Sequence, residues 1–392
     1  MKRVLPTRAI VYLAVAAVTA FAAEAAAAPC SALPGATYIT GSSAVKPFIA
    51  GLGKALAGTT TLVYKGQGSC LGVDAVFNGT KVTGTASYWD ASGVEQSCDL
   101  DVAGTTADVG VSDVFSATCA GFGPTPAGIG DFFGPNQVMT FVVPKGSSQT
   151  MISAEAAYFV FGFGAAGMVT PWNNESFIFQ RSATSGTQSM LGAAINVTPS
   201  KWKGVSQSSS GNMLTAVASA AQPEAAIGIL ASTDADGARD KVKILAYQHY
   251  KQDCAWLPDS SSTSFDKINV RDGHYPIWGP VHLFAKVDAQ NTPVKPEAAK
   301  LVGYFTEKVA PPAGVSLLDL EIAAHTVPAC AMKVQRSSEL GPMTPYTSST
   351  PCGCYFEAKA NGAAPASCTA CTADTDCKGN NKHCRYGYCE AN

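Results

Sequence analysis

The chain has 392 residues, of which 27 are Lys or Arg and 29 are Asp or Glu, so its formal net charge is −2. Because no basic stripe interrupts this near balance, the composition argues against a protein that binds nucleic acid. The length is sufficient for two lobes with hydrophobic cores and a further small appendage.

The first residues are typical of an export signal. The basic start Met1-Lys2-Arg3 precedes an alanine-rich apolar run over residues 9–28, and residues suitable for cleavage lie near Ala26 to Pro29. A membrane anchor is the alternative, but the apolar core is too short to span a bilayer comfortably. We therefore expect residues 1–28 to be a signal peptide and the mature protein to reach the bacterial periplasm or the cell surface.

The cysteines also indicate an oxidising location. All thirteen follow the signal, and their odd number leaves at least one thiol free or paired elsewhere. Seven lie from Cys352 onward, where too few apolar residues are present to fold without cross-links. The sequence predicts a small disulfide-bonded tail, which is tied to the body if Cys254 or Cys330 pairs with it. The alternative is a zinc site, whose ligands would be Cys368, Cys371, Cys384 and either His383 or Cys389.

Strand-like and helix-like segments alternate along the main body, which predicts an α/β fold. The expected strands are residues 37–40, 62–64, 108–113, 138–143, 176–180, 226–230, 242–245 and 281–284. The expected helices include residues 48–56, 73–77, 153–161, 188–195 and 296–306, and one that begins at Ser210. A polar, Gly- and Thr-rich stretch at 81–106 is interpreted as an insertion, and residues 336–351 as a linker rich in Ser, Pro and Thr.

The loop from Arg181 to Thr187 is the best candidate for an anion site. It joins a predicted strand to a predicted helix, whose first turn has free N–H groups and partial positive charge. Arg181 offers a planar fork of donors, Ser185 and Thr187 offer hydroxyl groups, and Gly186 permits close approach to the backbone. An ordinary helix cap beside a surface arginine is the alternative.

The same chemistry recurs in a fixed order along the chain. The motifs are Gly41–Pro47, Gly66–Ser69, Val111–Asp113, Arg181–Thr187 and Asp272–Ile277. In this order they resemble the periplasmic phosphate-binding proteins of ABC uptake systems, and the resemblance covers roughly residues 36–330. It implies a type II periplasmic-binding-protein fold, with two α/β lobes, two crossovers and a ligand cleft.

The resemblance also implies how the chain is divided. Residues 29–335 would form the two-lobed domain, with lobe 1 at about 36–138 and 276–335 and lobe 2 at about 139–275. The Cys-rich tail would occupy residues 352–392. The implied protein is a monomeric binding protein without enzymatic activity, cofactor or metal, and its partners would be inorganic phosphate and an ABC transporter permease.

Carried over residue by residue, the resemblance implies that both lobes contribute to the phosphate site. The implied ligands are Ser43, Ala44, Ser69, Asp113, Arg181, Ser185, Gly186 and Thr187. Three positions depart from the family. Ala183 replaces an Asp that is common beside the Arg, Ala44 replaces a hydroxyl residue, and Gly279 stands where an Arg often follows the Tyr-Pro motif.

Other classes of function are weighed against this one. Ser43-Ala44-Val45-Lys46 matches the Ser-x-x-Lys pattern of serine hydrolases, but the pattern recurs at Ser200–Lys203 and Ser264–Lys267 and no Lys-Thr-Gly accompanies it. Asp234-Ala235-Asp236-Gly237 hints at a calcium loop without the full twelve-residue pattern. A surface or adhesive protein that uses the binding fold as a scaffold and the tail for docking is the third class.

Overall fold

The structure is a computed structural model that describes residue 1, residues 27–306 and residues 308–391. Most of the predicted export signal therefore lies outside the described residues. Across the part of the chain that is described, no helix is both long and apolar enough to cross a bilayer.

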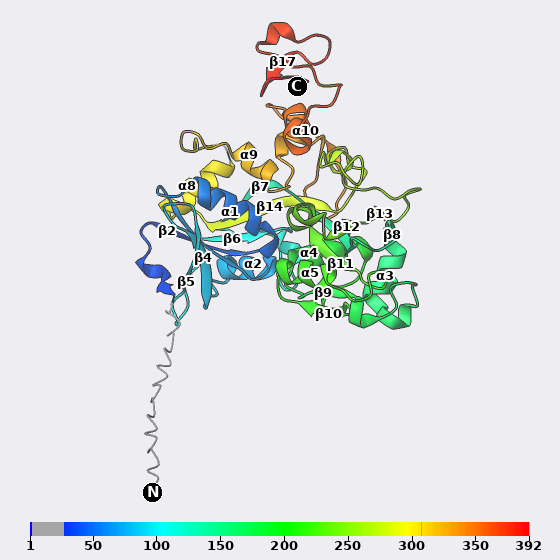
Figure 1. Cartoon of the computed structure of the whole chain (residues 1–392). Helices are drawn as coiled ribbons and strands as arrows, with labels where there is room; N and C mark the ends of the chain where they lie inside the picture. The colour runs from blue at the N-terminus through cyan, green and yellow to red at the C-terminus, as the bar shows by residue number, and fades with distance from the viewer. Residues whose placement is uncertain (2–26, 307, 392) are drawn as a thin grey trace.

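A ten-stranded mixed sheet runs through the body in the order β1-β5-β4-β3-β2-β6-β14-β7-β11, with β12 also paired to β7 (Figure 1). Its strands are β1 (Ala28–Pro29), β2 (Ala36–Gly41), β3 (Thr61–Gly66), β4 (Thr85–Trp89), β5 (Glu95–Asp99), β6 (Val109–Ser112), β7 (Ile129–Pro144), β11 (Gly228–Ala231), β12 (Val242–Ile244) and β14 (Trp278–Lys286). The predicted α/β fold is confirmed.

Strand β7 is the element that joins the two lobes. Over Ile129–Val138 it pairs with β14, and from Met139 onward it pairs with β11 and β12. Its last ten residues are all buried, which explains the continuous apolar run in the sequence. One strand therefore belongs to the first lobe at its start and to the second lobe at its end.

The first lobe is built from β2, β3 and β6, with helices packed against them. Its helices are α1 (Lys46–Ala55), α2 (Ser69–Phe77), α8 (Pro296–Phe305) and α9 (Leu317–Ala323). Phe48, Ile49 and Leu52 lie on one face of α1 and are buried, as the helical spacing in the sequence predicts.

The predicted insertion at 81–106 extends this sheet. Strands β4 and β5 form an antiparallel hairpin whose first strand pairs with β3. The Cys30–Cys98 disulfide joins the start of the described body to this hairpin. The polar character of the stretch reflects an exposed edge, because the first three residues of β5 are exposed and β5 pairs only with the two-residue β1 on its outer side.

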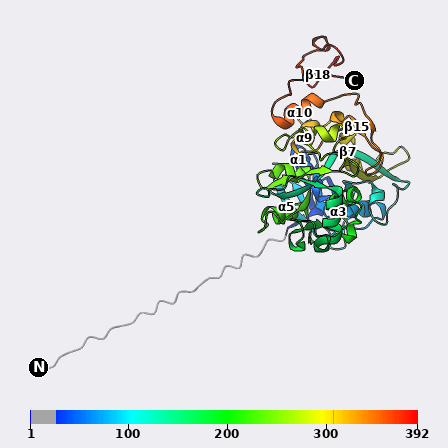
Figure 2. The same cartoon turned by 90° about the vertical axis from the view of Figure 1, so that its right-hand side faces the viewer.

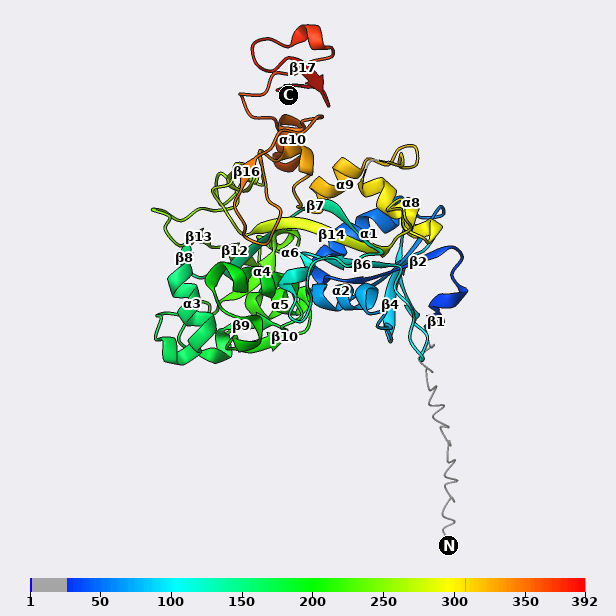
Figure 3. The same cartoon turned by 180° about the vertical axis from the view of Figure 1, so that it is seen from behind.

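The second lobe packs its helices around the far half of β7. Its helices are α3 (Ala154–Phe163), α4 (Gly186–Ile195), α5 (Ser210–Ala218), α6 (Ser232–Ala235) and α7 (Ile268–Arg271), and its further strands are β8 (Met151–Ser153), β9 (Phe179–Arg181), β10 (Val205–Gln207) and β13 (Ala246–Gln248). Phe141 of β7 stacks on Phe161 of α3 at a ring distance of 5.6 Å in the core. Figure 3 shows from behind that these elements lie to one side of β7 and β14, and β2–β6 to the other.

The C-terminal region projects from the body on the side of α9 (Figures 1 and 2). It contains β15 (Val334–Gln335), β16 (Thr344–Pro345), α10 (Gly353–Asn361), β17 (His383–Arg385) and β18 (Tyr388–Glu390). Its disulfides are Cys354–Cys368, Cys371–Cys384 and Cys377–Cys389. The predicted disulfide-bonded tail is confirmed, and the cysteines of the zinc alternative are all engaged in these pairs.

Two further disulfides and one thiol complete the pattern. Cys70–Cys119 lies within the first lobe, and Cys330–Cys352 ties the tail to the body, which is one of the two possibilities left open by the sequence. Cys254 is free and exposed, so the odd number of cysteines leaves one thiol unpaired.

Candidate anion-binding site

Three parallel strands of the first lobe end at the same edge of the sheet. β2 pairs in parallel with both β3 and β6, so the loops that follow them lie together. These loops carry Ser43, Ser69 and Asp113, which the sequence singled out. Ligands of open α/β sheets bind at the carboxyl ends of such strands, so the topology makes this edge a natural binding site.

Asp113 is the centre of the first-lobe part of the site. It is 1% exposed, and its Oδ2 accepts hydrogen bonds from Ser42 Oγ at 2.5 Å and from Ser69 Oγ at 3.1 Å. Burial raises the pKa of Asp113 to about 6, although the two serines and the charge of Arg181 act in the opposite direction. Its Oδ1 has no hydrogen-bond partner among the described residues.

Arg181 reaches the cleft from the second lobe, at the end of β9. Its Nη1 donates to Ser210 Oγ at 3.1 Å, and its Nη2 donates to Ser43 Oγ across the cleft, also at 3.1 Å. Its Nε donates to the Gln207 carbonyl at 3.0 Å, which fixes the plane of the guanidinium. Burial lowers the pKa of Arg181 and nearby carboxylates raise it, but the group stays cationic at neutral pH.

The start of α4 lies directly against the first-lobe residues. Ser185 is its N-cap and accepts a hydrogen bond from Gln188 N at 3.4 Å, while Thr187 is buried in the first turn. A Cβ on Gly186 would lie 2.2 Å from Ser69 Oγ and 2.9 Å from Asp113 Oδ2. The two lobes can therefore approach this closely only because residue 186 is a glycine.

Ala44 occupies a different position from the other predicted ligands. Its N–H donates to Ser42 Oγ at 3.1 Å, and its carbonyl accepts a hydrogen bond from Thr233 Oγ1 at 2.7 Å. The N–H of Ala44 thus caps the turn after β2, and its carbonyl contacts the second lobe. Its place as a ligand remains a prediction.

Asp234, at α6, is a site residue that sequence reasoning missed. It lines a groove of about 550 Å³ that also contains Ser43 and Ser210. Burial raises its pKa to about 7, while hydrogen bonding from Ser210 and the charge of Arg181 lower the pKa. The sequence places Asp234 more than 50 residues from Arg181, and its nearest pattern suggested calcium, so no local signal identified it.

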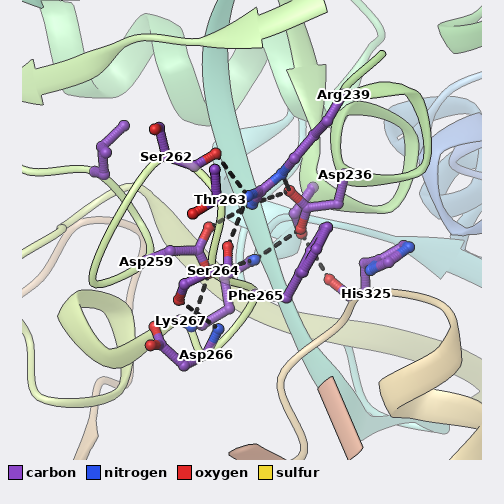
Figure 4. A network of polar contacts seen from close by, with 12 residues as sticks. Asp236, Arg239, Asp259, Ser262, Thr263, Ser264, Phe265, Asp266, Lys267 and His325 are labelled. Atoms are coloured by element: carbon purple, nitrogen blue, oxygen red, sulfur yellow. Dashed lines mark hydrogen bonds and ion pairs between the residues drawn. The ribbon is translucent and has the colours of Figure 1, made fainter. Parts of the chain in front are cut away.

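The calcium and hydrolase alternatives find other structural explanations. Asp236 binds Arg239 at 2.6 Å and Lys267 at 2.7 Å in a buried network that also includes Asp259 (Figure 4), so its carboxylate is neutralised by two cations. Lys46 forms an ion pair with Glu95 at 2.7 Å, whereas Ser43 Oγ hydrogen-bonds to Arg181 and Ser210. The lysine and the serine of the Ser-x-x-Lys pattern thus have separate partners, and no hydrogen bond between them is found among the described residues.

Taken together, the site combines one guanidinium, several hydroxyl donors and a helix N-terminus with two carboxylates. The donors suit a tetrahedral oxyanion, and the carboxylates accept hydrogen bonds. Such a set can hold an anion that itself carries an acidic proton.

Comparisons with known proteins agree with this fold. No protein-family model and no curated protein matches the sequence. Among solved structures, one assigned as a phosphate ABC transporter substrate-binding protein with bound phosphate, from Clostridium perfringens, is 14% identical, with a TM-score of 0.50 over 75% of this chain and 99% of that chain. An ABC-type phosphate transport receptor from Vibrio cholerae is also 14% identical, with a TM-score of 0.46 over 74% of this chain and 99% of that chain. A high affinity periplasmic phosphate-binding protein, PfluDING, bound with phosphate, is 15% identical, with a TM-score of 0.47 over 74% and 90%.

The fold is therefore that of the two-lobed periplasmic binding proteins. The resemblance to phosphate-binding members that the ordered motifs predicted is confirmed at the level of the fold.

Proposed function

We propose that this chain is an exported solute-binding protein that captures inorganic phosphate, as hydrogen phosphate, between its two lobes. The observation that carries the proposal is the meeting of Arg181 from one lobe with Ser43 from the other, at 3.1 Å, beside the buried carboxylate of Asp113. A cation and hydroxyl donors attract an oxyanion, and the carboxylate accepts the proton that hydrogen phosphate still carries. The proposed ligands are Ser43, Ala44, Ser69, Asp113, Arg181, Ser185, Gly186 and Thr187.

The proposal includes a division of labour between parts of the chain. Residues 1–28 direct export, residues 36–138 and 276–335 form one lobe, and residues 139–275 form the other. Closure of the lobes buries the ligand, and the closed form presents it to an ABC transporter permease. The binding protein itself performs no chemistry.

Isothermal titration of the mature, oxidised protein against phosphate and sulfate tests the proposal. We expect saturable binding of phosphate and much weaker binding of sulfate. Equal affinity for both anions, or no heat with either, contradicts it. Mass spectrometry of the exported protein tests the signal, because an intact Met1 would show that residues 1–28 are retained.

A surface or adhesive role is the second candidate, and the projecting C-terminal region favours it (Figure 2). The three disulfides from Cys354 onward give that region a fixed shape without a large core. Retention of the full chain on cell envelopes, lost on removal of residues 352–392 and unaffected by phosphate, would support this role.

A further inference from the structure

The anion site contains more carboxylate than a simple phosphate site needs. Asp113 approaches it from the first lobe and Asp234, which lines the groove with Ser43 and Ser210, from the second, and Arg181 is the cation whose charge acts on both carboxylates. Asp113 Oδ1 and Asp234 Oδ2 are both shielded from solvent and have no hydrogen-bond partner among the described residues. Two buried acceptor atoms without donors are costly unless a ligand supplies the donors.

Asp234 is held in this position by the same residues that hold Arg181. The Ser210 hydroxyl accepts from Arg181 Nη1 at 3.1 Å and also hydrogen-bonds to Asp234. Ser210 Oγ in turn lies 3.2 Å from Ser43 Oγ of the first lobe. Through Ser210 the carboxylate of Asp234 is thus held near the guanidinium of Arg181.

Apart from Arg181, whose charge also acts on Asp113, the neighbouring charged groups do not neutralise the carboxylate of Asp234. Several elements pack against α6. Three of them carry no ionisable side chain, namely α5, β11 and the turn at residues 43–45. The charged side chains of the other elements packed against α6 have partners of their own. Lys46 binds Glu95, and Lys243 donates to the Ser147 carbonyl. Asp131 binds His282, and Asp236 binds Lys267 and Arg239. Lys54 of α1 lies near Glu95. Lys65, which also lines the groove, donates to the Thr85 carbonyl.

Two further buried groups face the carboxylates. Tyr64 donates to the Ser42 carbonyl, and its pKa is raised well above the usual value by burial and by the charges of Asp113 and Asp234, so it remains neutral. Glu339 faces Asp113 from the C-terminal segment, and burial raises its pKa to about 7. Burial raises the pKa values of Asp113 and Asp234 to about 6 and about 7, in line with a site that retains protons near neutrality.

We infer that the filled cleft holds two acidic protons, one between phosphate and Asp113 and one between phosphate and Asp234, so that the site selects dihydrogen phosphate. This inference rests on the proposed function and replaces the hydrogen phosphate named there by the form that carries one more proton. With hydrogen phosphate and two ionised carboxylates, one carboxylate oxygen would face a phosphate oxygen with no proton between them. The second proton removes that repulsion and lowers the negative charge of the filled site by one.

The inference fixes a proton count that can be measured. At about pH 8 free phosphate is mainly the dianion and both carboxylates are ionised, so binding must take up about one proton per phosphate. Titration calorimetry of the wild-type protein with inorganic phosphate, in two buffers of different ionisation enthalpy, measures this uptake. The dissociation constant for total phosphate should rise about tenfold per pH unit above the second pKa of phosphate.

Asp234→Asn should remove the proton uptake and flatten the pH dependence, because its amide can donate to an unprotonated phosphate oxygen. Asp240→Asn is the matched control, since Asp240 is an exposed carboxylate of the same lobe, and it should behave as the wild type. The wild-type proton count decides the question even if the Asp234 variant does not fold. Phosphate binding without proton uptake at about pH 8 overturns this inference and leaves phosphate binding standing, whereas no phosphate binding at any pH overturns both.

Discussion

Arg181 is the residue on which anion affinity should depend most. Arg181→Ala removes two donors with full charge, and a hydrogen bond to a charged group contributes roughly 1.5–3 kcal/mol, so a loss of at least a hundredfold in affinity is expected. Ser69→Ala removes one neutral donor and should cost about 1 kcal/mol, or about fivefold. Titration calorimetry with phosphate measures the affinity of both variants. Ser206→Ala is the control, because Ser206 is exposed. Small, equal effects would place the ligand elsewhere.

Asp113 should set the choice between phosphate and sulfate. Its carboxylate can accept the proton of hydrogen phosphate, whereas sulfate has no proton and leaves the buried carboxylate without a donor. We expect this difference to amount to roughly 1.5–3 kcal/mol, or about tenfold or more in affinity. Asp113→Asn should narrow the gap in competition against labelled phosphate at neutral pH. An unchanged ratio of the two affinities in the variant would refute this role.

The same carboxyl group should make the stability of the empty protein depend on pH. Because the pKa of Asp113 is raised to about 6, the folded protein binds this proton more tightly than the unfolded chain does. The stabilisation that comes from protonating Asp113 is therefore fully present below about pH 4, the pKa of Asp113 in the unfolded chain. It is lost as the pH rises through about 6, the pKa of Asp113 in the folded protein. The loss is on the order of 3 kcal/mol at about 1.4 kcal/mol per pKa unit.

Urea unfolding without phosphate, at about pH 4.5 and pH 7.5, measures this effect as the difference between the wild type and Asp113→Asn. The variant should gain stability relative to the wild type at the higher pH. A difference that does not change with pH would mean that Asp113 ionises freely in the folded protein.

At the scale of elements, the N-terminus of α4 should be the contact that closes the cleft. Gly186→Ala places a methyl group 2.2 Å from Ser69 Oγ, which belongs to the other lobe. The lobes can separate to relieve this overlap, so we expect at least a tenfold loss of phosphate affinity with little loss of thermal stability. Gly237→Ala is the control, because a Cβ there meets nothing within 4 Å. Normal binding by the Gly186 variant would show that the lobes do not meet at α4.

The elements around the site were largely predictable from the sequence, because each is a local strand–loop–helix unit. The loops that precede α1, α2 and α4 were identified from their Gly and Ser residues together with the apolar spacing of the helices. The β4–β5 hairpin was not predicted from the sequence, because its position at the edge of the sheet leaves its residues polar. Asp234 and Ser210 were missed as site residues because only the packing of α5 and α6 against the cleft brings them to Arg181.

At the scale of the whole molecule, the C-terminal region binds both lobes. Glu357 of α10 pairs with Arg271 of the second lobe at 2.6 Å, and Tyr355 donates to Asp319 of the first lobe at 2.6 Å. Glu339 accepts hydrogen bonds from Phe115 N at 3.3 Å and from Thr118 Oγ1 at 3.4 Å, just beyond Asp113. The segment expected to be a linker therefore packs against the body, which its Ser- and Pro-rich composition did not indicate.

A chain that ends at Gln335, with Cys330→Ser to avoid a free thiol, tests what this region contributes. It should lose about 3 kcal/mol of stability or more, because the Cys330–Cys352 disulfide and the buried packing of Phe356 are removed. Its phosphate affinity should match that of the full mature chain, since the removed residues supply none of the proposed ligands. Unfolding and titration experiments measure the two effects separately. A large loss of affinity in the folded shortened chain would show that Glu339 shapes the site through Phe115.

The position of β14 in the sheet has a consequence for how the protein reaches its folded state. This strand lies between β6 and β7, yet it is made after the entire second lobe. A chain that emerges from its N-terminus can therefore assemble the contiguous second lobe before the first lobe has all of its strands. The first lobe, and with it the edge that carries Ser43, Ser69 and Asp113, is completed late, through contacts between residues far apart in sequence. Such long-range pairing slows folding, so binding competence is acquired only after residue 286 has been delivered.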